Sequence, residues 1–244
     1  MKLVMHIAAA VLLACAVSGS ESGPLPDGDA LMEQVRRALP EEPMRIDAEL
    51  RTQNHRGEII RVLNARIDLH WGADIPEAEY HIRDRFGVQR ERFRISWPSG
   101  EDPEYEYAKG DPLQHAPVPG LFERIEGTEI SWADLTLSFL WWQGAETVGT
   151  DQRRGRFCYV VDVSPADLTE DTYSRVRMWV DPETSLLLQA DAFDVEGNAM
   201  RRLQVKSLRR INDVWMVQDL DVHRLPSRNK TTLRVRDLTV QNSR

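Results

Sequence analysis

Apolar and polar residues alternate along much of this chain with a period of two. Between residues 59 and 71, one set of alternate positions is apolar: Leu63, Ala65, Ile67, Leu69 and Trp71. The intervening positions are polar: Asn64, Arg66, Asp68 and His70. The alternation recurs around Tyr80 and Ile82 and again from Phe93 to Trp97. Because successive side chains of a strand point to opposite faces, the pattern predicts antiparallel strands with one buried and one wet face.

The last hundred residues are divided into strand-length segments by turn residues. Four breaks carry the Pro, Gly or Asn chemistry of tight turns: residues 181–184, 196–198, 212–213 and 226–229. The predicted strands are residues 157–163, 174–181, 185–194, 199–209, 213–224 and 230–240. With the upstream strands they form a meander of about ten strands. There is no internal repeat and no second domain boundary.

Two segments have helical spacing instead. Asp29 to Leu39 places apolar residues on one helical face, and Pro40 ends it. Residues 131–142 begin with Ser131 and Asp134 at the spacing of a capping box, and the following residues are apolar almost all round. A helix of this kind must be covered on most sides or must itself cover something.

Residues 98–121 fit neither pattern. Five prolines and three glycines exclude a central strand or a long helix there. A segment of this length is either a functional flap or an unstructured insert, and both alternatives remain open.

The predicted fold class is mainly β: a single antiparallel half-open β-barrel of about ten strands, with an N-terminal helix and a short apolar lid helix. Two short helices cover only part of so large an apolar face, so we predict a cavity suited to an elongated apolar guest. Its predicted lining is Ile67, Leu69, Tyr80, Phe93, Phe157, Tyr159, Met178, Leu186, Leu188 and Val205. The predicted lid residues are Leu135, Phe139, Trp141 and Trp142. Each aromatic residue alone fits a core role, whereas the cluster favours a lid.

Residues 1–20 have the features of a secretory signal peptide: a basic start, an apolar run from Leu3 to Ala14 and then small residues. The run is too short to span a bilayer. Leu12-Leu13-Ala14-Cys15 resembles a bacterial lipobox, in which Cys15 becomes the lipidated first residue. The alternative is ordinary cleavage after Ser18 or Gly19, which discards Cys15. In either case residues 21–244 form the predicted mature domain.

Composition and motifs exclude several kinds of function. The net charge is −8, with 39 acidic and 31 basic residues, which argues against a nucleic-acid partner. Arginine alternates with acidic residues, as in Arg90-Glu91-Arg92, which predicts a solvated face. The six histidines lack zinc-site spacing, and no nucleophile elbow or phosphate-binding loop is present. Cys158, within an apolar strand, is interpreted as a small buried side chain. We expect no enzymatic activity, metal or cofactor.

One block of the chain has a recognisable order of turns and strands. It comprises residues 176–184, then Leu186-Leu187-Leu188, then the turn Asp194-Val195-Glu196-Gly197-Asn198. Residues 212–217 and the strand from Thr231 to Leu238 extend it. This block resembles the LolA-like outer-membrane lipoprotein-sorting family, well over about residues 130–240 and weakly upstream.

The resemblance implies a half-open barrel with a helical lid that carries lipoprotein acyl chains across the periplasm. In the family, an arginine on an early strand holds the lid shut. The nearest match is the strand containing Arg92 and Arg94, but the family's preceding proline is missing there, so neither arginine is assigned that role.

We therefore expect non-catalytic binding of a lipid or of lipoprotein acyl chains in the periplasm, with sorting of lipoproteins to the outer membrane. Membrane contact would be peripheral or through a lipid anchor at Cys15. The alternative is an envelope-stress sensor or protein-interaction module built on the same half-barrel, with an envelope protein as its partner.

Overall fold

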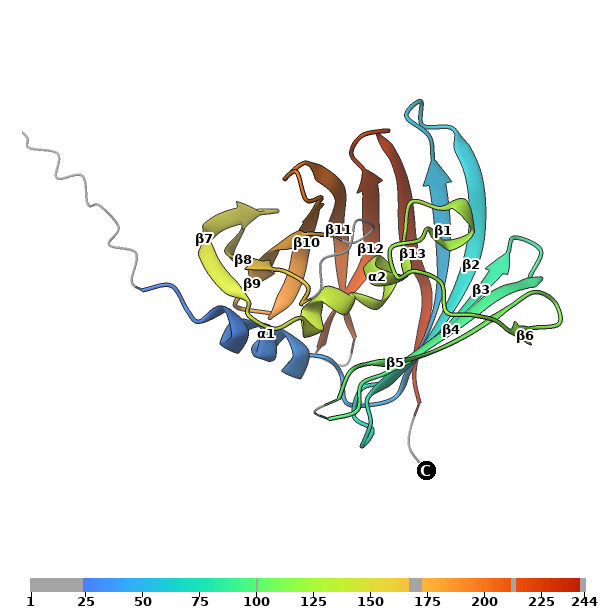
Figure 1. Ribbon diagram of the computed structural model, residues 1–244, viewed down its shortest axis with the longest axis horizontal. Helices are drawn as coiled ribbons and strands as arrows, with labels where there is room; N and C mark the ends of the chain where they lie inside the picture. The colour runs from blue at the N-terminus through green and yellow to red at the C-terminus, as the bar shows by residue number, and fades with distance from the viewer. Residues whose placement is uncertain (1–23, 100, 167–172, 212–213, 242–244) are drawn as a thin grey trace, which may run out of the picture.

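The computed structural model describes residues 24–99, 101–166, 173–211 and 214–241 (Figure 1). The predicted signal peptide, including Cys15, lies outside the described residues. The strands of the N-terminal half are β1 (Met44–Gln53), β2 (Ile59–His70), β3 (Glu77–Asp84), β4 (Gln89–Ser96), β5 (Glu104–Lys109) and β6 (Gln114–His115). Those of the C-terminal half are β7 (Glu146–Arg153), β8 (Arg156–Val163), β9 (Arg175–Asp181), β10 (Leu186–Phe193), β11 (Ala199–Ile211), β12 (Val214–Arg224) and β13 (Asn229–Val240).

All thirteen of these strands form one antiparallel sheet, in the order β6-β5-β4-β3-β2-β1-β13-β12-β11-β10-β9-β8-β7. The sheet consists of two meanders that join where β1 pairs with β13, from Met44 opposite Val240 to Gln53 opposite Lys230. It curls into a half-barrel whose edge strands, β6 and β7, are consecutive in the chain (Figure 1). The half-open form is confirmed.

The predicted number of strands, about ten, was too low. The prediction missed β5 and β6, which lie within the proline-rich segment 98–121 that was predicted to be a flap or an unstructured insert, and it missed β7. All three lie at or next to a sheet edge, where residues are largely exposed and the apolar alternation that marks a half-buried strand is weak.

The helices are short. Helix α1 (Gly28–Arg37) has Asp27 as its N-cap, whose side chain accepts a hydrogen bond from the Ala30 amide. The predicted helix over 131–142 is instead two pieces, α2 (Trp132–Thr136) and the 3-10 helix η2 (Ser138–Trp141). Leu137 separates them with a left-handed backbone, φ 51°. The predicted capping box of Ser131 and Asp134 is confirmed. None of the helices in the described part of the chain has the length and apolar composition needed to cross a bilayer.

The connection between β6 and β7, residues 116–145, crosses the concave face of the sheet (Figure 1). We call this segment the plug; it contains the 3-10 turn η1 (Ile125–Gly127), α2 and η2. Its buried side chains, including Ile125, Trp132 and Phe139, belong to the same core as the inward-facing residues of the strands. The plug therefore fills much of the hollow that the sheet would otherwise enclose.

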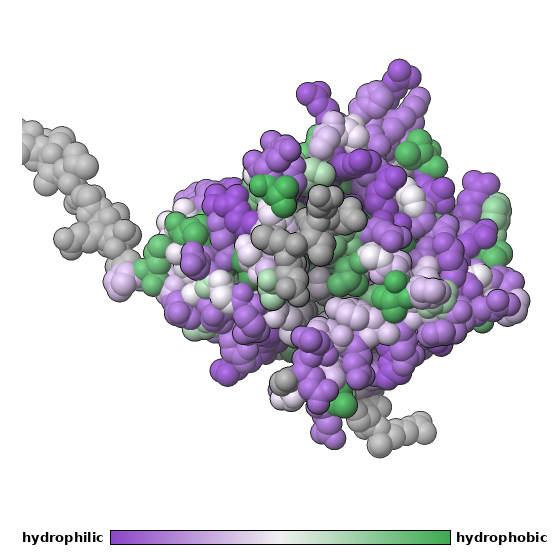
Figure 2. Space-filling model, in the orientation of Figure 1, coloured by the Kyte–Doolittle hydropathy of each residue, from purple (hydrophilic) through white to green (hydrophobic). Residues whose placement is uncertain are grey.

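The convex face is polar and carries many cross-strand ion pairs. Examples are Arg45 with Asp68 and Arg234 with Asp219, each at 2.7 Å. Polar side chains also cover most of the surface that faces the viewer in Figure 2, on the side of the plug, with smaller apolar spots between them. One part of the predicted solvated face is wrong. Glu91 shares the inward face of β4 with Phe93 and Ile95 and is only 4% exposed, because its neighbours Arg90 and Arg92 take the outward positions.

Candidate functional site

An apolar cavity of about 240 Å³ lies between α1, the plug and the concave face of the sheet. Helix α1 and the turn after it contribute Val35, Ala38, Leu39 and Pro40. The plug contributes Ile130, Asp134, Leu135, Thr136, Leu137, Leu140 and Trp141. The sheet side contributes Ile46, Ile67, Leu69, Trp71, Tyr80, Ser185, Leu186, Leu187, Leu203, Val205, Met216, Val217, Leu220, Val222, Leu233 and Val235. Asp134 is the one charged residue among these lining residues.

Half of the predicted lining and lid residues line this cavity: Ile67, Leu69, Tyr80, Leu135, Trp141, Leu186 and Val205. The others lie elsewhere. Phe93, Met178 and Phe139 are buried in the core around the cavity, and Trp142 and Tyr159 are half-buried against that core. Phe157 is 49% exposed and contacts the ring of Tyr159.

Leu188 differs most from expectation, because it belongs to a separate small cluster with Cys158, Val160 and Trp179. The register of β10 against β9 shifts between Leu187 and Gln189. This irregularity puts Leu187, and not Leu188, on the cavity side. The interpretation of Cys158 as a small buried side chain is confirmed.

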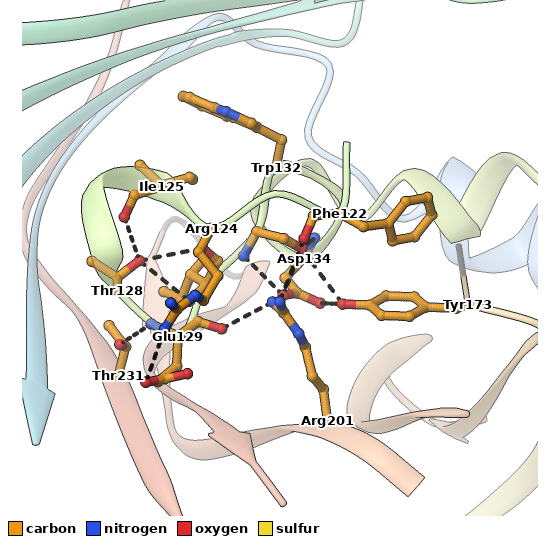
Figure 3. Close-up of polar contacts among 12 residues, drawn as sticks. Phe122, Arg124, Ile125, Thr128, Glu129, Trp132, Asp134, Tyr173, Arg201 and Thr231 are labelled. Atoms are coloured by element: carbon orange, nitrogen blue, oxygen red, sulfur yellow. Dashed lines mark hydrogen bonds and ion pairs between the residues drawn. The ribbon is translucent and has the colours of Figure 1, made fainter. Parts of the chain in front are cut away.

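The plug is tied to the sheet by a buried ion pair between Asp134 of α2 and Arg201 of β11 (Figure 3). Arg201 Nη1 donates to Asp134 Oδ2 at 2.6 Å and to the Glu129 carbonyl at 3.0 Å. Its Nη2 donates to the Phe122 carbonyl at 3.4 Å. One arginine on the sheet therefore holds three positions of the plug.

The Asp134 carboxylate also accepts hydrogen bonds within and beyond the plug. The Ser131 hydroxyl donates to Oδ2 at 2.7 Å, and the Tyr173 hydroxyl donates to Oδ1 at 3.0 Å. Burial, reinforced by the nearby Asp134 charge, raises the pKa of Tyr173 well above its ordinary value. Burial acts against the charge of Arg201, but the Asp134 carboxylate outweighs it and raises the pKa of Arg201. Arg201 therefore stays charged although it is largely removed from water.

Beside this ion pair, Thr231 of β13 forms a further contact with the plug. The Glu129 amide donates to the Thr231 hydroxyl at 2.8 Å, and the same hydroxyl lies 2.9 Å from the hydroxyl of Thr52 (Figure 3 shows the Glu129 contact). Both threonines are fully buried.

Aromatic contacts hold both ends of the α2–η2 region. Trp132 stacks on Phe93 with ring centroids 4.5 Å apart. Trp141 stacks on Trp97 at 4.5 Å and on Trp71 at 5.4 Å. Stacked pairs of this kind contribute about 0.5–1.5 kcal/mol beyond the burial of their area. The plug is thus fixed by Trp132, by the Asp134–Arg201 pair and by Trp141.

No sequence signal pointed to Arg201, since one arginine within a long strand carries no motif. Arg92 and Arg94, the nearest matches to the family's lid-holding arginine, lie on the convex face. Arg92 pairs with Glu79 at 3.5 Å, and Arg94 pairs with Glu77 and Glu106. Neither contacts the plug through these pairs, so withholding the role from them is consistent with the structure.

The size and lining of the cavity limit what it accepts. Pockets for small-molecule ligands are commonly ~300–1,000 Å³, so 240 Å³ accommodates only part of a long acyl chain while the plug is in place. The apolar walls, with one paired carboxylate, favour burial of an apolar group. The arrangement suits an apolar guest that displaces part of the plug.

The architecture is shared with solved bacterial structures. A DUF1329 family protein from Desulfovibrio piger aligns with a TM-score of 0.75 and 16% identity, over 89% of this chain and 93% of that one. A candidate outer membrane lipoprotein-sorting protein domain from Vibrio parahaemolyticus aligns at 0.74 and 13% identity, over 89% and 93%. A LolA superfamily protein from Nitrosomonas europaea aligns at 0.61 and 11% identity, over 90% and 96%.

These alignments confirm the predicted resemblance: the chain has the LolA-like half-barrel fold. Residues 120–243, more than half of the chain, match a protein-family model described as "-like: Uncharacterized protein", and the chain belongs to that family. None of the curated protein sequences matches this chain.

Proposed function

We propose that this protein binds the acyl chain of a lipid or lipoprotein, without catalysis, in the cavity between α1, the plug and the sheet. The observation that carries the proposal is that cavity, whose lining is apolar apart from a few polar groups beside the plug. The fold it shares with a candidate lipoprotein-sorting domain and a LolA superfamily protein supports the same class of ligand. The expected location is the periplasm, with or without a lipid anchor on Cys15.

Movement of the plug is part of the proposal. Burial of an acyl chain yields ~0.8 kcal/mol per CH₂ group, so a 16-carbon chain offers on the order of 12 kcal/mol. A protein that collected all of this would hardly release its guest. Breaking the contacts of Arg201, Trp132 and Trp141 opposes binding and reduces the net affinity. Movement of the plug thus enlarges the cavity for the acyl chain, and the cost of that movement makes release of the chain feasible.

The test compares the wild-type protein with Val205→Phe. Val205 is 1% exposed on β11 and lines the cavity, so the larger ring occupies the space of the guest. We expect fatty acid or an acylated peptide to change hydrogen exchange in residues 131–142 of the wild type. The variant should bind at least tenfold more weakly. Arg234→Met, on the convex face, is the control and should bind as the wild type does.

Organic extraction of purified protein followed by lipid mass spectrometry provides an independent readout. Co-purified lipid supports the proposal. Unchanged exchange in the plug together with equal binding by Val205→Phe would refute it. A lipid-free protein that forms a stable complex with a membrane-protein ectodomain would instead support the sensor or interaction module.

A further inference from the structure

The apolar cavity is closed toward one end of the strands and open toward the other. Its innermost lining residues are almost fully buried: Tyr80, Ile130 and Val222 are 2%, 1% and 0% exposed. The lining residues at the opposite end are half-buried and lie after α1, after β2, before β10 and near the start of β12: Pro40, Trp71, Ser185 and Met216. We call this end the mouth of the cavity, because solvent reaches the lining there.

An amphiphile fits this cavity in one direction only. Burial of a charged head group away from water, without a partner, is costly. The tail therefore points toward Tyr80 and Val222, and the head group stays at the mouth. The charged side chains around the mouth thus decide which head group is favoured.

Arg209 of β11 lies at the mouth, on the concave face of the sheet. It is directly opposite Met216 in the pairing of β11 with β12, and such partners project from the same face with Cα atoms ~4.5–5.5 Å apart. Met216 lines the cavity and packs against the main core. The preceding residue, Leu208, packs against the separate cluster of Cys158 and Trp179 on the other face. The Arg209 side chain is exposed, so its guanidinium group stands in water beside the entrance.

Among the described residues, none neutralises the positive charge of Arg209. Two other arginines of β11 have acidic partners at 2.6 Å: Arg201 pairs with Asp134, and Arg202 pairs with Asp191. No ion pair or hydrogen bond joins the Arg209 side chain to another residue in the described part of the chain. An exposed cation beside an apolar entrance therefore remains available to a guest.

Two acidic stretches border the mouth, and neither neutralises Arg209. Glu183, in the β9–β10 turn, pairs with Arg156 at 3.1 Å. The acidic residues 41–42 lie beside the end of β2, because a Cβ atom on Gly72 would come within 2.3 Å of the carbonyl oxygen of residue 41. Strand β2 is four positions from β11 in the sheet, which corresponds to ~19 Å along the sheet at ~4.8 Å per strand. The side of the mouth formed by β11 therefore favours a negatively charged head group.

We propose that the cavity takes an acyl chain with an anionic head group, a carboxylate or a phosphate, which pairs with Arg209 at the mouth. This ligand class depends on the acyl-chain binding proposed above and specifies what the same site accepts. A guanidinium group presents a planar fork of N–H donors that matches carboxylate and phosphate oxygens. Free fatty acids and phosphorylated lipids share this chemistry, and their relative affinities distinguish the two sources.

The test is calorimetric titration of the full protein with decanoate, decyl phosphate, 1-decanol and decylamine, which share one chain length. Both anions should bind about threefold to fivefold more tightly than 1-decanol, as expected of an exposed ion pair. Decylamine should bind no more tightly than 1-decanol. Raising the salt concentration from about 0.1 M to about 1 M should reduce the preference, because the Debye length falls from ~10 Å to ~3 Å. Tighter binding of decyl phosphate than of decanoate indicates a phosphorylated lipid, and the reverse indicates a free fatty acid.

Variants at the mouth and in the cavity separate the head group from the tail. Arg209→Met should lower the affinity for decanoate to that for 1-decanol and leave 1-decanol binding unchanged. Arg209→Glu should reverse the preference, so that decylamine binds more tightly than decanoate. Arg210→Met is the matched control and should keep the wild-type preference, since the next side chain of a strand points to the opposite face. Val205→Phe should weaken binding of all these ligands alike, because it fills the cavity and leaves the mouth unchanged.

The preference for anions is overturned if the wild type binds decanoate, 1-decanol and decylamine equally, or if Arg209→Met keeps the preference. In both cases, saturable binding that Val205→Phe weakens would leave acyl-chain binding in the cavity intact. Absence of saturable binding for every one of these ligands would overturn both the preference and the proposed function.

Discussion

The ion pair between Arg201 and Asp134 allows a direct test of how the plug is held. In Arg201→Met the side chain keeps its length and loses its charge and its three hydrogen bonds to Asp134, Glu129 and Phe122. The Asp134 side chain, 4% exposed, then keeps only neutral donors such as Ser131 and Tyr173. Removing one partner of a buried ion pair typically costs ~3–5 kcal/mol.

Because all three acceptors lie in the plug, most of this loss should appear as easier opening of the plug. A difference of ~3 kcal/mol corresponds to about two orders of magnitude in the open population. Hydrogen-exchange mass spectrometry of residues 120–142 measures this change, and urea denaturation measures the loss of global stability. Fatty acid should also bind faster to the variant, since the plug opens before or during entry.

The control is Arg234→Met, which removes an ion pair of similar length, 2.7 Å, at a position 47% exposed. Exposed pairs contribute ~1 kcal/mol or less, so exchange in the plug should not change. Asp134→Asn in the Arg201→Met background removes the unpaired charge and should recover part of the stability. Equal exchange in the plug of Arg201→Met and wild type would refute the assignment of Arg201 as the residue that holds it.

Three further predictions concern the plug and its surroundings. Trp141→Ala removes two stacked pairs and should lower the free energy of unfolding by at least ~1–3 kcal/mol. The near-ultraviolet circular dichroism should also change strongly, and an unaltered spectrum would contradict the stacking. Thr231→Val leaves the buried Glu129 amide without its acceptor and should cost ~1–3 kcal/mol by urea denaturation, whereas Thr239→Val at the exposed end of β13 should be neutral. In the folded protein the pKa of Glu91 is raised from 4.5 to about 7. Its stabilising contribution to the free energy of unfolding is therefore fully present below pH 4.5 and is lost as the pH rises through 7. Wild-type stability should therefore fall by on the order of 3 kcal/mol relative to Glu91→Gln between pH 4.5 and pH 8, and parallel pH profiles would disprove the shift.

The local sequence pattern alone was sufficient to predict the fold class. Period-two alternation in β2–β4 and the turn chemistry between β9 and β13 predicted antiparallel strands, because each depends only on neighbours in the chain. The N-terminal helix and the Ser131–Asp134 capping box were predicted for the same reason. Alternation also predicted the inward face that Ile67, Leu69 and Val205 share, because alternate side chains of a strand point to the same side of the sheet.

Tertiary structure alone decided the features that depend on distant contacts. The break at Leu137, the register shift that turns Leu188 away and the inward position of Glu91 are set by packing against other elements. Arg201 is 67 residues from Asp134, and no local pattern connects them. The sequence by itself determined that a curved, one-sidedly apolar sheet forms. The tertiary structure decided which side chains fill the concave face and which ion pair holds the plug against the sheet. Both depend on packing between segments that are far apart in the chain.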